Sequence, residues 1–310
     1  MRNAALGLLL AALAAPAAPA AGQQVHVLIA TGLAGEPRFA TTFHTAAAAL
    51  YDAAGRWGVA DSSRVYLAEN PALDATRIKG VATRDAVAAA LTALARRTAA
   101  GDVLLVFLLA HGSGFGPNSR LSLPGPDATA ADFATWLTGF TRQTVVVVHA
   151  GSAGGDFVET LAAPGRIIIT ATRGATERNE TVFAEPFVRG LSGEAADADK
   201  DGRTSLREAF DYARHEVARV YEASNRLQTE HARLSDSVLA GGVAFGPAPT
   251  AADPRVAALL AERRALEGEV AALRARKDGM PPAEYDRELE RLLLAIAAKT
   301  QAIRAAGGTP

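Results

Sequence analysis

Apolar positions in this chain form two patterns, short continuous runs and longer helical stripes. Continuous runs occur at residues 25–30, 64–67, 103–110, 145–148 and 167–170. Such runs are typical of parallel strands that are covered on both faces. Between the runs, apolar residues recur at helical spacing, as in Phe39, Phe43 and Ala47. This alternation predicts an α/β fold with three layers, in which a mainly parallel sheet carries helices on both faces.

Two of the predicted strands run directly into turns that carry chemically useful side chains. The run at residues 103–110 is followed by His111 and Gly112, and the run at residues 145–148 by a small-residue turn that contains Ser152. In open parallel sheets, ligands gather outside the carboxyl ends of the strands. A histidine and a serine at this edge predict nucleophilic hydrolysis of an amide or ester.

Each residue of this edge has an expected role. Ser152 is the candidate nucleophile and His111 its general base or acid, while the backbone N–H groups of Gly112 and Ser152 are candidate oxyanion donors. His149, at the end of its strand, is interpreted as a core or rim residue. Arg173 and Glu177 follow the next strand on the same rim. They are candidate substrate-binding residues, with a merely solvated polar loop as the alternative.

An acidic segment at residues 197–208 has the spacing of a calcium-binding loop. It reads D-x-D-x-D-G-x-x-S-x-x-E, and the predicted ligands are Asp197, Asp199, Asp201, the backbone carbonyl of Arg203, Ser205 and Glu208. Oxygen ligands at these positions wrap Ca²⁺ in EF-hand loops, and the glycine provides the sharp turn. The sequence contains no second loop of this kind. We therefore expect an unpaired, structural Ca²⁺ site, with a metal-free capped acidic turn as the alternative.

The ends of the chain differ in composition from its middle. Residues 1–21 begin with Met1 and Arg2, continue as an apolar stretch and end in small residues, which predicts a signal peptide and an exported, periplasmic or secreted protein. An uncleaved, Ala-rich anchor helix is the alternative. Residues 239–252 are interpreted as a linker. Residues 253–306 carry two apolar stripes separated by a Gly-Met-Pro-Pro turn, which predicts an antiparallel helical hairpin. Because two helices alone are marginal, we expect the hairpin to dock or to self-associate.

Composition excludes several function classes. The chain has 310 residues, no cysteine and a formal net charge of −1. Without cysteine there is no disulfide, no zinc–thiolate site and no thiol nucleophile. Charges of both signs are interspersed, so we expect no nucleic-acid partner. No segment after the N-terminus is apolar enough to predict a transmembrane span.

The two strand-end turns together resemble the caspase–hemoglobinase fold, in particular its legumain-like (peptidase C13-like) branch. In that family the second turn reads approximately E-A-C-x-S-G, and the turn of this chain aligns with it when Ser152 takes the place of the catalytic cysteine and Gly155 that of the glycine. The resemblance covers residues 25–235 and implies a caspase-like domain at residues 22–238 that includes the acidic loop. It implies a peptidase-like activity, with a peptide or protein as ligand.

The cysteine-to-serine replacement leaves three functions open. A hydroxyl has almost no anionic fraction at neutral pH, so the replacement favours a catalytically impaired or inactive pseudo-peptidase. The alternatives are an active serine-dependent peptidase or hydrolase that uses Ser152 and His111, and a non-catalytic scaffold that binds partners through the hairpin.

Overall fold

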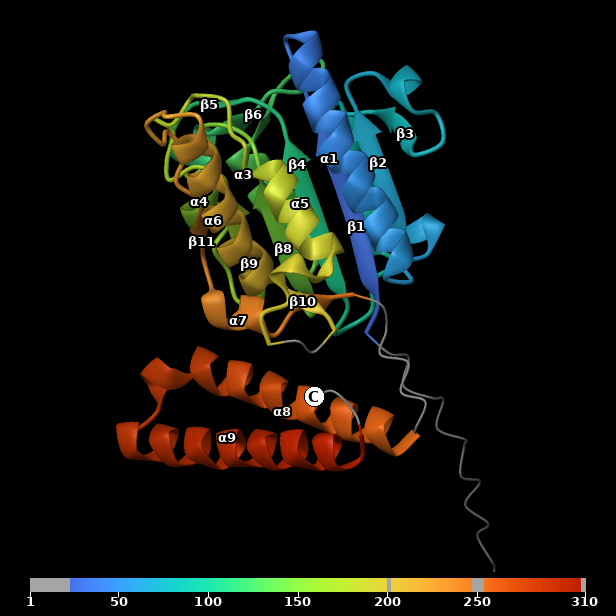
Figure 1. Cartoon of the computed structure of the whole chain (residues 1–310). Helices are drawn as coiled ribbons and strands as arrows, with labels where there is room; N and C mark the ends of the chain where they lie inside the picture. Colours follow the sequence, from blue (N-terminus) through green and yellow to red (C-terminus); the bar gives the residue numbers. More distant parts are fainter. Residues whose placement is uncertain (1–22, 200–201, 247–253, 308–310) are drawn as a thin grey trace, which may run out of the picture.

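The computed structural model describes residues 23–199, 202–246 and 254–307, and its centre is a seven-stranded sheet (Figure 1). The strand order is β11-β9-β8-β4-β1-β2-β3, with every neighbouring pair parallel except β11 and β9. The strands are β1 (Val25–Thr31), β2 (Arg64–Ala68), β3 (Ile78–Val81), β4 (Val103–Leu109), β8 (Thr144–His149), β9 (Arg166–Thr170) and β11 (Arg233–Leu234). The central strands β1, β4 and β8 are buried along nearly their whole length, as continuous apolar runs predict.

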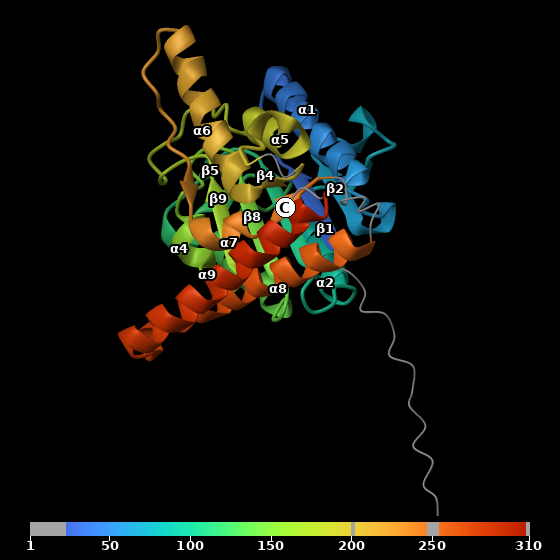
Figure 2. The ribbon, with the colours of Figure 1, turned by 60° about the horizontal axis from the view of Figure 1, so that its bottom comes forward.

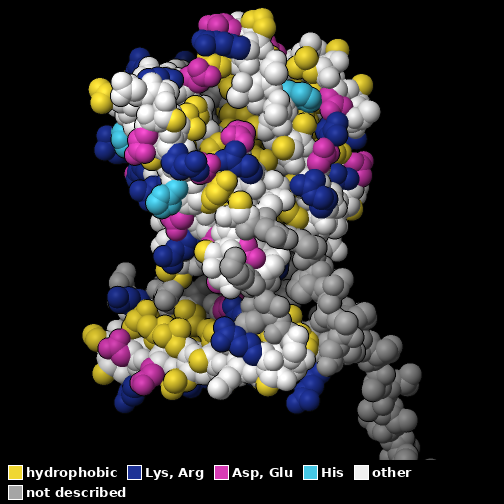
Figure 3. Space-filling view, in the orientation of Figure 1, with side chains coloured by type: hydrophobic (Ala, Val, Ile, Leu, Met, Phe, Trp, Pro, Cys, Tyr) yellow, Lys and Arg dark blue, Asp and Glu magenta, His cyan; other side chains and the backbone are white. Residues whose placement is uncertain are grey.

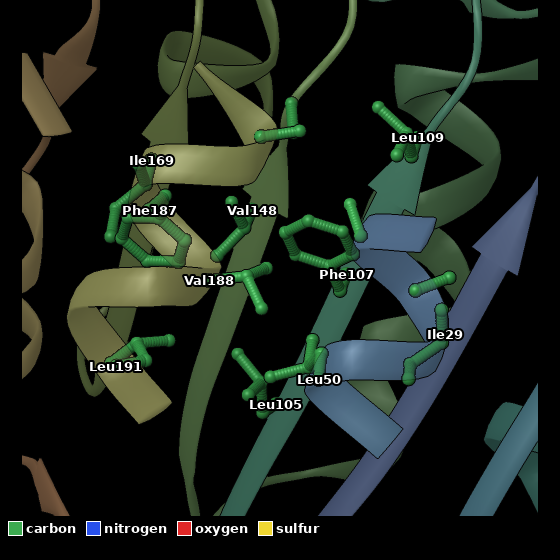
Figure 4. Packing of buried hydrophobic residues seen from close by; sticks show 14 of the residues in the cluster. Ile29, Leu50, Leu105, Phe107, Leu109, Val148, Ile169, Phe187, Val188 and Leu191 are labelled. Carbon is green, nitrogen blue, oxygen red and sulfur yellow. The ribbon is translucent and has the colours of Figure 1, made fainter. Parts of the chain in front are cut away.

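Helices cover both faces of this sheet. The helices are α1 (Pro37–Arg56), α2 (Arg84–Ala95), α3 (Ala130–Trp136), α4 (Phe157–Leu161), α5 (Ala184–Ser192), α6 (Leu206–Ala223) and α7 (Ser237–Gly241). Helices α1, α5 and α6 contribute to one hydrophobic cluster with the sheet, and α2, α3 and α4 to the other. Figure 4 shows the first cluster, in which Phe107 of β4 lies between α1 and α5. The fold class predicted from the sequence is confirmed.

The order of the strands places a topological switch between β1 and β4. From β1 the chain moves outward to β2 and β3, and then returns to β4 and moves the other way to β8 and β9. A crevice outside the carboxyl ends of the strands at such a switch is where open α/β sheets bind ligands. The loops that leave β1, β4 and β8 therefore define the edge at which a site is expected.

Short strands tie the loops to the sheet at both ends. At the carboxyl edge, β5 (Gly112–Ser113), β6 (Arg120–Leu121) and β7 (Ala128–Thr129) form a small antiparallel sheet. Helix α3 follows it and begins with a capping box in which Thr129 and Asp132 exchange side-chain to backbone hydrogen bonds. At the opposite end, β10 (Thr204–Ser205) pairs with β12 (Ala244–Phe245).

The expected linker needs a correction because part of it is folded. Residues 239–241 end α7 and residues 244–245 form β12, and the buried ring of Phe245 lies 4.7 Å from that of Trp57, centroid to centroid. The Gly-rich composition hid a strand that is only two residues long. Residues 247–252 of the expected linker lie outside the described residues, as do residue 253 and the predicted signal peptide at residues 1–21.

The C-terminal segment is a helical hairpin with its own small core. Helices α8 (Pro254–Ala275) and α9 (Pro282–Ala305) pack against each other through Leu273, Tyr285 and Leu292. Figures 1 and 2 place this hairpin at the end of the α/β unit that is opposite to the carboxyl ends of the parallel strands. Among the described residues, no helix is both long and apolar enough to cross a membrane.

Candidate functional site

His111 lies in the turn after β4, but its ring faces the segment that leaves β1. The Nε2 atom is 3.2 Å from the carbonyl oxygen of Ala34, which requires the ring to donate from this nitrogen. The ring packs edge-on against Phe39 at 5.1 Å between centroids, and Phe43 lies 5.7 Å away. His111 therefore packs against the segment between β1 and α1 and the start of α1, and no hydrogen bond joins it to Ser152 within the described part of the chain.

Ser152 lies in the turn after β8 and is only 4% exposed. Its Oγ accepts a hydrogen bond from the backbone N–H of Gly112 at 3.4 Å. The N–H expected to serve as an oxyanion donor thus points at the hydroxyl of the expected nucleophile. The next residue, Ala153, has a φ of +52°, a left-handed conformation that costs a residue with a Cβ about 1–2 kcal/mol. A hydrogen bond of 2.8 Å from the Ala153 N–H to the Glu177 carbonyl holds this conformation.

Glycines in these turns sit where backbones touch. A Cβ on Gly151 would overlap the carbonyl oxygen of Ala110, and one on Gly155 would overlap the backbone at Arg173 and Gly174. Similarly, a Cβ on Gly32 would overlap the carbonyl oxygen of Ser122. The strand-end turns are therefore packed backbone against backbone, and this packing closes the edge around Ser152.

His149, the last residue of β8, is fully buried. Its ring lies 4.8 Å from that of Phe157 in a T-shaped arrangement. Neither ring nitrogen has a hydrogen-bond partner among the described residues. Burial lowers the pKa of His149 to about 4, so the ring is neutral at physiological pH. The interpretation as a core residue is consistent with this burial, but its nitrogens are unsatisfied.

The two candidate substrate-binding residues have different environments. Glu177 has a side chain that is 11% exposed, and its carboxylate accepts hydrogen bonds from the N–H groups of Arg173 and His231 at 2.7 and 3.0 Å. It also lies 2.7 Å from Nδ1 of His231. Arg173 has a side chain that is 71% exposed. Glu177 therefore joins two loops of the rim, whereas the guanidinium of Arg173 is accessible to a ligand.

The acidic loop lies at the opposite end of the sheet, and three of its described carboxylates converge. One carboxylate oxygen from each of Asp197, Asp199 and Glu208 lies within 4.8 Å of the others. The N–H of Gly202 donates to Asp197 at 2.9 Å, and Ser205 forms a capping box with Glu208 at the start of α6. Asp201 lies outside the described residues.

One side of the acidic loop pairs with a short strand that follows α7. Thr204 and Ser205 form β10, which pairs with β12 at residues 244–245. The guanidinium of Arg203 also donates to the carbonyl oxygen of Ala244. A short strand from outside any second acidic loop therefore occupies the edge of this loop.

Sequence reasoning missed Glu230, a buried carboxyl group beside α5. This residue is 2% exposed and accepts hydrogen bonds from the N–H groups of Val182 and Phe183 at 2.7 and 3.3 Å. Burial raises its pKa to about 7. A single glutamate in a polar stretch gives no sequence signal for burial, because its environment is built by α5 and α6 from elsewhere in the chain.

Comparisons with known proteins find similarity in solved structures alone. No protein-family profile matches the chain, and a search of curated proteins found no relative. The solved structures it resembles include drICE, a caspase, at 7% identity and a TM-score of 0.42 over 69% of this chain and 88% of drICE. A structural-genomics protein from Geobacter sulfurreducens is similar at 12% identity and a TM-score of 0.43 over 74% of this chain and 96% of that protein. Raptor from Chaetomium thermophilum reaches a TM-score of 0.36 at 11% identity, over 55% of this chain and 17% of Raptor.

Proposed function

We propose that this chain is a catalytically inactive, legumain-like or caspase-like protein, whose α/β domain binds a peptide or protein ligand without cleaving it. The observation that carries this proposal is the geometry of Ser152. Its hydroxyl is buried and bonded to the Gly112 N–H, while His111 donates to Ala34 and packs against Phe39. A serine nucleophile needs an adjacent base to become reactive, and no base of the described residues is in hydrogen-bond contact with this serine.

The absence of cysteine from the sequence allows a direct test of reactivity at this position. A Ser152→Cys variant carries one thiol, and a Ser62→Cys variant carries one thiol at an exposed position. We expect iodoacetamide to alkylate Cys at position 152 about tenfold more slowly than at position 62, because the side chain at position 152 is buried. Faster alkylation at position 152 would indicate an activated, accessible site and contradict the proposal.

The alternative function, a serine-dependent hydrolase, has its own test. A fluorophosphonate probe should not label the wild-type protein, and Ser152→Ala should give the same background. Labelling of the wild-type protein that disappears in Ser152→Ala and in His111→Ala would establish the hydrolase instead. This activity would be insensitive to thiol alkylators, because the chain has no thiol.

We also propose that the acidic loop binds Ca²⁺ as a structural ion in an exported protein. Asp197, Asp199 and Glu208 fit such an ion because their carboxylate oxygens converge, and Asp201, Ser205 and the Arg203 carbonyl complete the predicted set. When bound, the ion neutralises repulsion among these carboxylates. The loop lies opposite the carboxyl end of β8, the strand that Ser152 follows, so its effect is on stability.

Terbium luminescence can test this calcium proposal. A hollow of about 310 Å³ is lined by both Trp57 and Asp197, so the indole lies close enough to sensitise Tb³⁺ in the loop. We expect emission that Ca²⁺ displaces and that Glu208→Gln abolishes, together with a melting temperature that rises in Ca²⁺ more than in Mg²⁺. Trp57→Phe should remove the emission and keep the thermal shift. Equal melting temperatures in millimolar Ca²⁺ and in chelator would contradict the proposal.

A further inference from the structure

Two adjoining pockets lie between α6 and the segment that leads into β11, outside the closed turns. The first has a volume of about 470 Å³ and the second about 440 Å³. Asp211, Arg214 and Ala232 line both. We refer to the two pockets together as the α6–β11 groove. Figure 3 shows arginine and histidine side chains, interspersed with carboxylates, on the face of the molecule over α6.

The charged side chains of the groove differ in whether they have a partner of opposite charge or a hydrogen-bond partner. Asp211 lies 3.8 Å from Arg207, and the carboxyl group of Glu230 is held by the backbone amides at the start of α5. Arg214 contacts the ring of Phe210, at 5.7 Å from its centroid, and no carboxylate of the described residues lies within ion-pair distance of it. The carboxylates of Asp211 and Glu230 thus have partners within the protein. The guanidinium of Arg214, which lines both pockets, can pair with a ligand.

The remaining walls fit a peptide in extended conformation. Phe183 and Val217 are buried apolar residues in the lining of the first pocket. Strand β11, whose residues Arg233 and Leu234 line the second pocket, is the terminal strand on its side of the described sheet. An extended segment can add to a terminal strand through main-chain hydrogen bonds, while its side chains enter neighbouring pockets.

We propose that the α6–β11 groove binds an extended peptide segment that carries an acidic side chain, with the carboxylate paired to Arg214. An arginine presents a planar fork of donors that matches a carboxylate with two parallel hydrogen bonds. The buried wall that Phe183 and Val217 give the first pocket takes a neighbouring hydrophobic side chain. The proposal deepens the proposed function, on which it rests, by naming the ligand and the place where it binds.

The test uses the full chain and an array of amidated hexapeptides. Each peptide has apolar residues and one glutamate, and has a matched copy with glutamine. We expect glutamate peptides to bind about tenfold more tightly than their glutamine copies, and Arg214→Gln to remove the difference. Ala218→Trp, which fills the first pocket, should abolish binding. Arg219→Gln is the matched control, because Arg219 lies on the same helix, pairs with Glu216 and does not line the groove.

Several results would overturn this assignment. These are equal binding of glutamate and glutamine copies, unchanged charge preference in Arg214→Gln, or loss of binding in Arg219→Gln as well. Circular dichroism and melting temperature confirm that each variant is folded. Labelling of Ser152 by the fluorophosphonate probe would overturn the proposed function but not this site, so the two failures are distinguishable.

Discussion

The carboxyl edge at β4 and β8 and the α6–β11 groove differ in how their polar groups are used. At the edge, the Ser152 hydroxyl, the His111 ring and the Glu177 carboxylate all bond to groups of the protein itself, and glycine backbones touch around them. In the groove, by contrast, Arg214 faces open volume without a carboxylate partner among the described residues. Ser152 and His111, whose types and spacing predicted catalysis, therefore have partners inside the protein. Arg214, which belongs to no sequence motif, is accessible to a ligand.

This difference shows that residue type and spacing indicate only what a site could do. A reaction or a ligand also requires hydrogen-bond donors and acceptors that are not already satisfied inside the fold. Whether such groups are satisfied depends on packing between segments that are far apart in the sequence. The predictions that follow test whether the edge is closed and whether the groove is independent of it.

The largest effect is expected from a methyl group added at the closed edge. In Gly151→Ala the new Cβ would overlap the carbonyl oxygen of Ala110, so the backbones of β4 and β8 must separate. We expect a loss of about 3 kcal/mol in the free energy of unfolding. In the control, Gly241→Ala, a Cβ meets no atom within 4 Å. Urea unfolding measures both, and a loss below about 0.5 kcal/mol for Gly151→Ala would show that the edge is loose.

Two buried ionisable groups, one in each region, should give opposite pH dependences. Glu230, beside the groove, has its pKa raised from 4.5 to about 7, so its contribution to stability is full below pH 4.5 and is lost as the pH rises through about 7. His149, at the edge, has its pKa lowered from 6.5 to about 4, so its contribution is full above pH 6.5 and is lost as the pH falls toward 4. Each shift corresponds to about 3 kcal/mol.

Between pH 4.5 and 6.5 these two contributions oppose each other in the wild-type protein. Glu230→Gln should therefore leave a stability that increases with pH over this range, and His149→Leu one that decreases. Denaturant unfolding at several pH values measures the slopes. Identical slopes in the wild-type protein and both variants would show that neither group changes its protonation on folding in the way described.

A smaller effect is expected at the contact between the two regions. Glu177 accepts hydrogen bonds from Arg173 and from His231, which lines the first pocket of the groove. Glu177→Gln weakens these charge-assisted contacts, and we expect a loss of about 1–2 kcal/mol. Arg173→Ala, at an exposed side chain, should change stability by less than about 0.5 kcal/mol. If the two variants had equal stability, Glu177 would not join these loops.

The smallest effect is expected from removal of the hairpin. Its core is separate from the two clusters of the sheet, and it lies at the end opposite the edge. A chain that ends at residue 249 should keep the melting temperature of the α/β domain and the peptide affinity of the groove. In the same truncated chain, Phe245→Ala should lose about 3 kcal/mol, because β12 belongs to the domain. An insoluble or molten truncated chain would show that the hairpin completes the core.

The sequence by itself determined the elements and the edge at which chemistry could occur. Continuous apolar runs predicted strands buried on both faces, and β4 and β8 are such strands. The placement of His111 and Ser152 at the carboxyl edge followed from where those runs end. The capping box of Thr129 and Asp132 at the start of α3 likewise lies within four consecutive residues. All of these depend on residues within a few positions of one another, which is why periodicity and spacing suffice.

Only the tertiary structure decided which polar side chains have partners inside the protein and which are accessible to a ligand. The bond from Gly112 to Ser152 joins residues 40 positions apart, and that from His231 to Glu177 joins residues 54 apart. The pairing of β10 with β12 and the burial of Glu230 likewise depend on contacts between distant segments. A sequence pattern reports the period of one element but not which element lies against it. The same physical reason hid the α6–β11 groove, since Arg214 on an amphipathic helix has the sequence context of any solvated arginine.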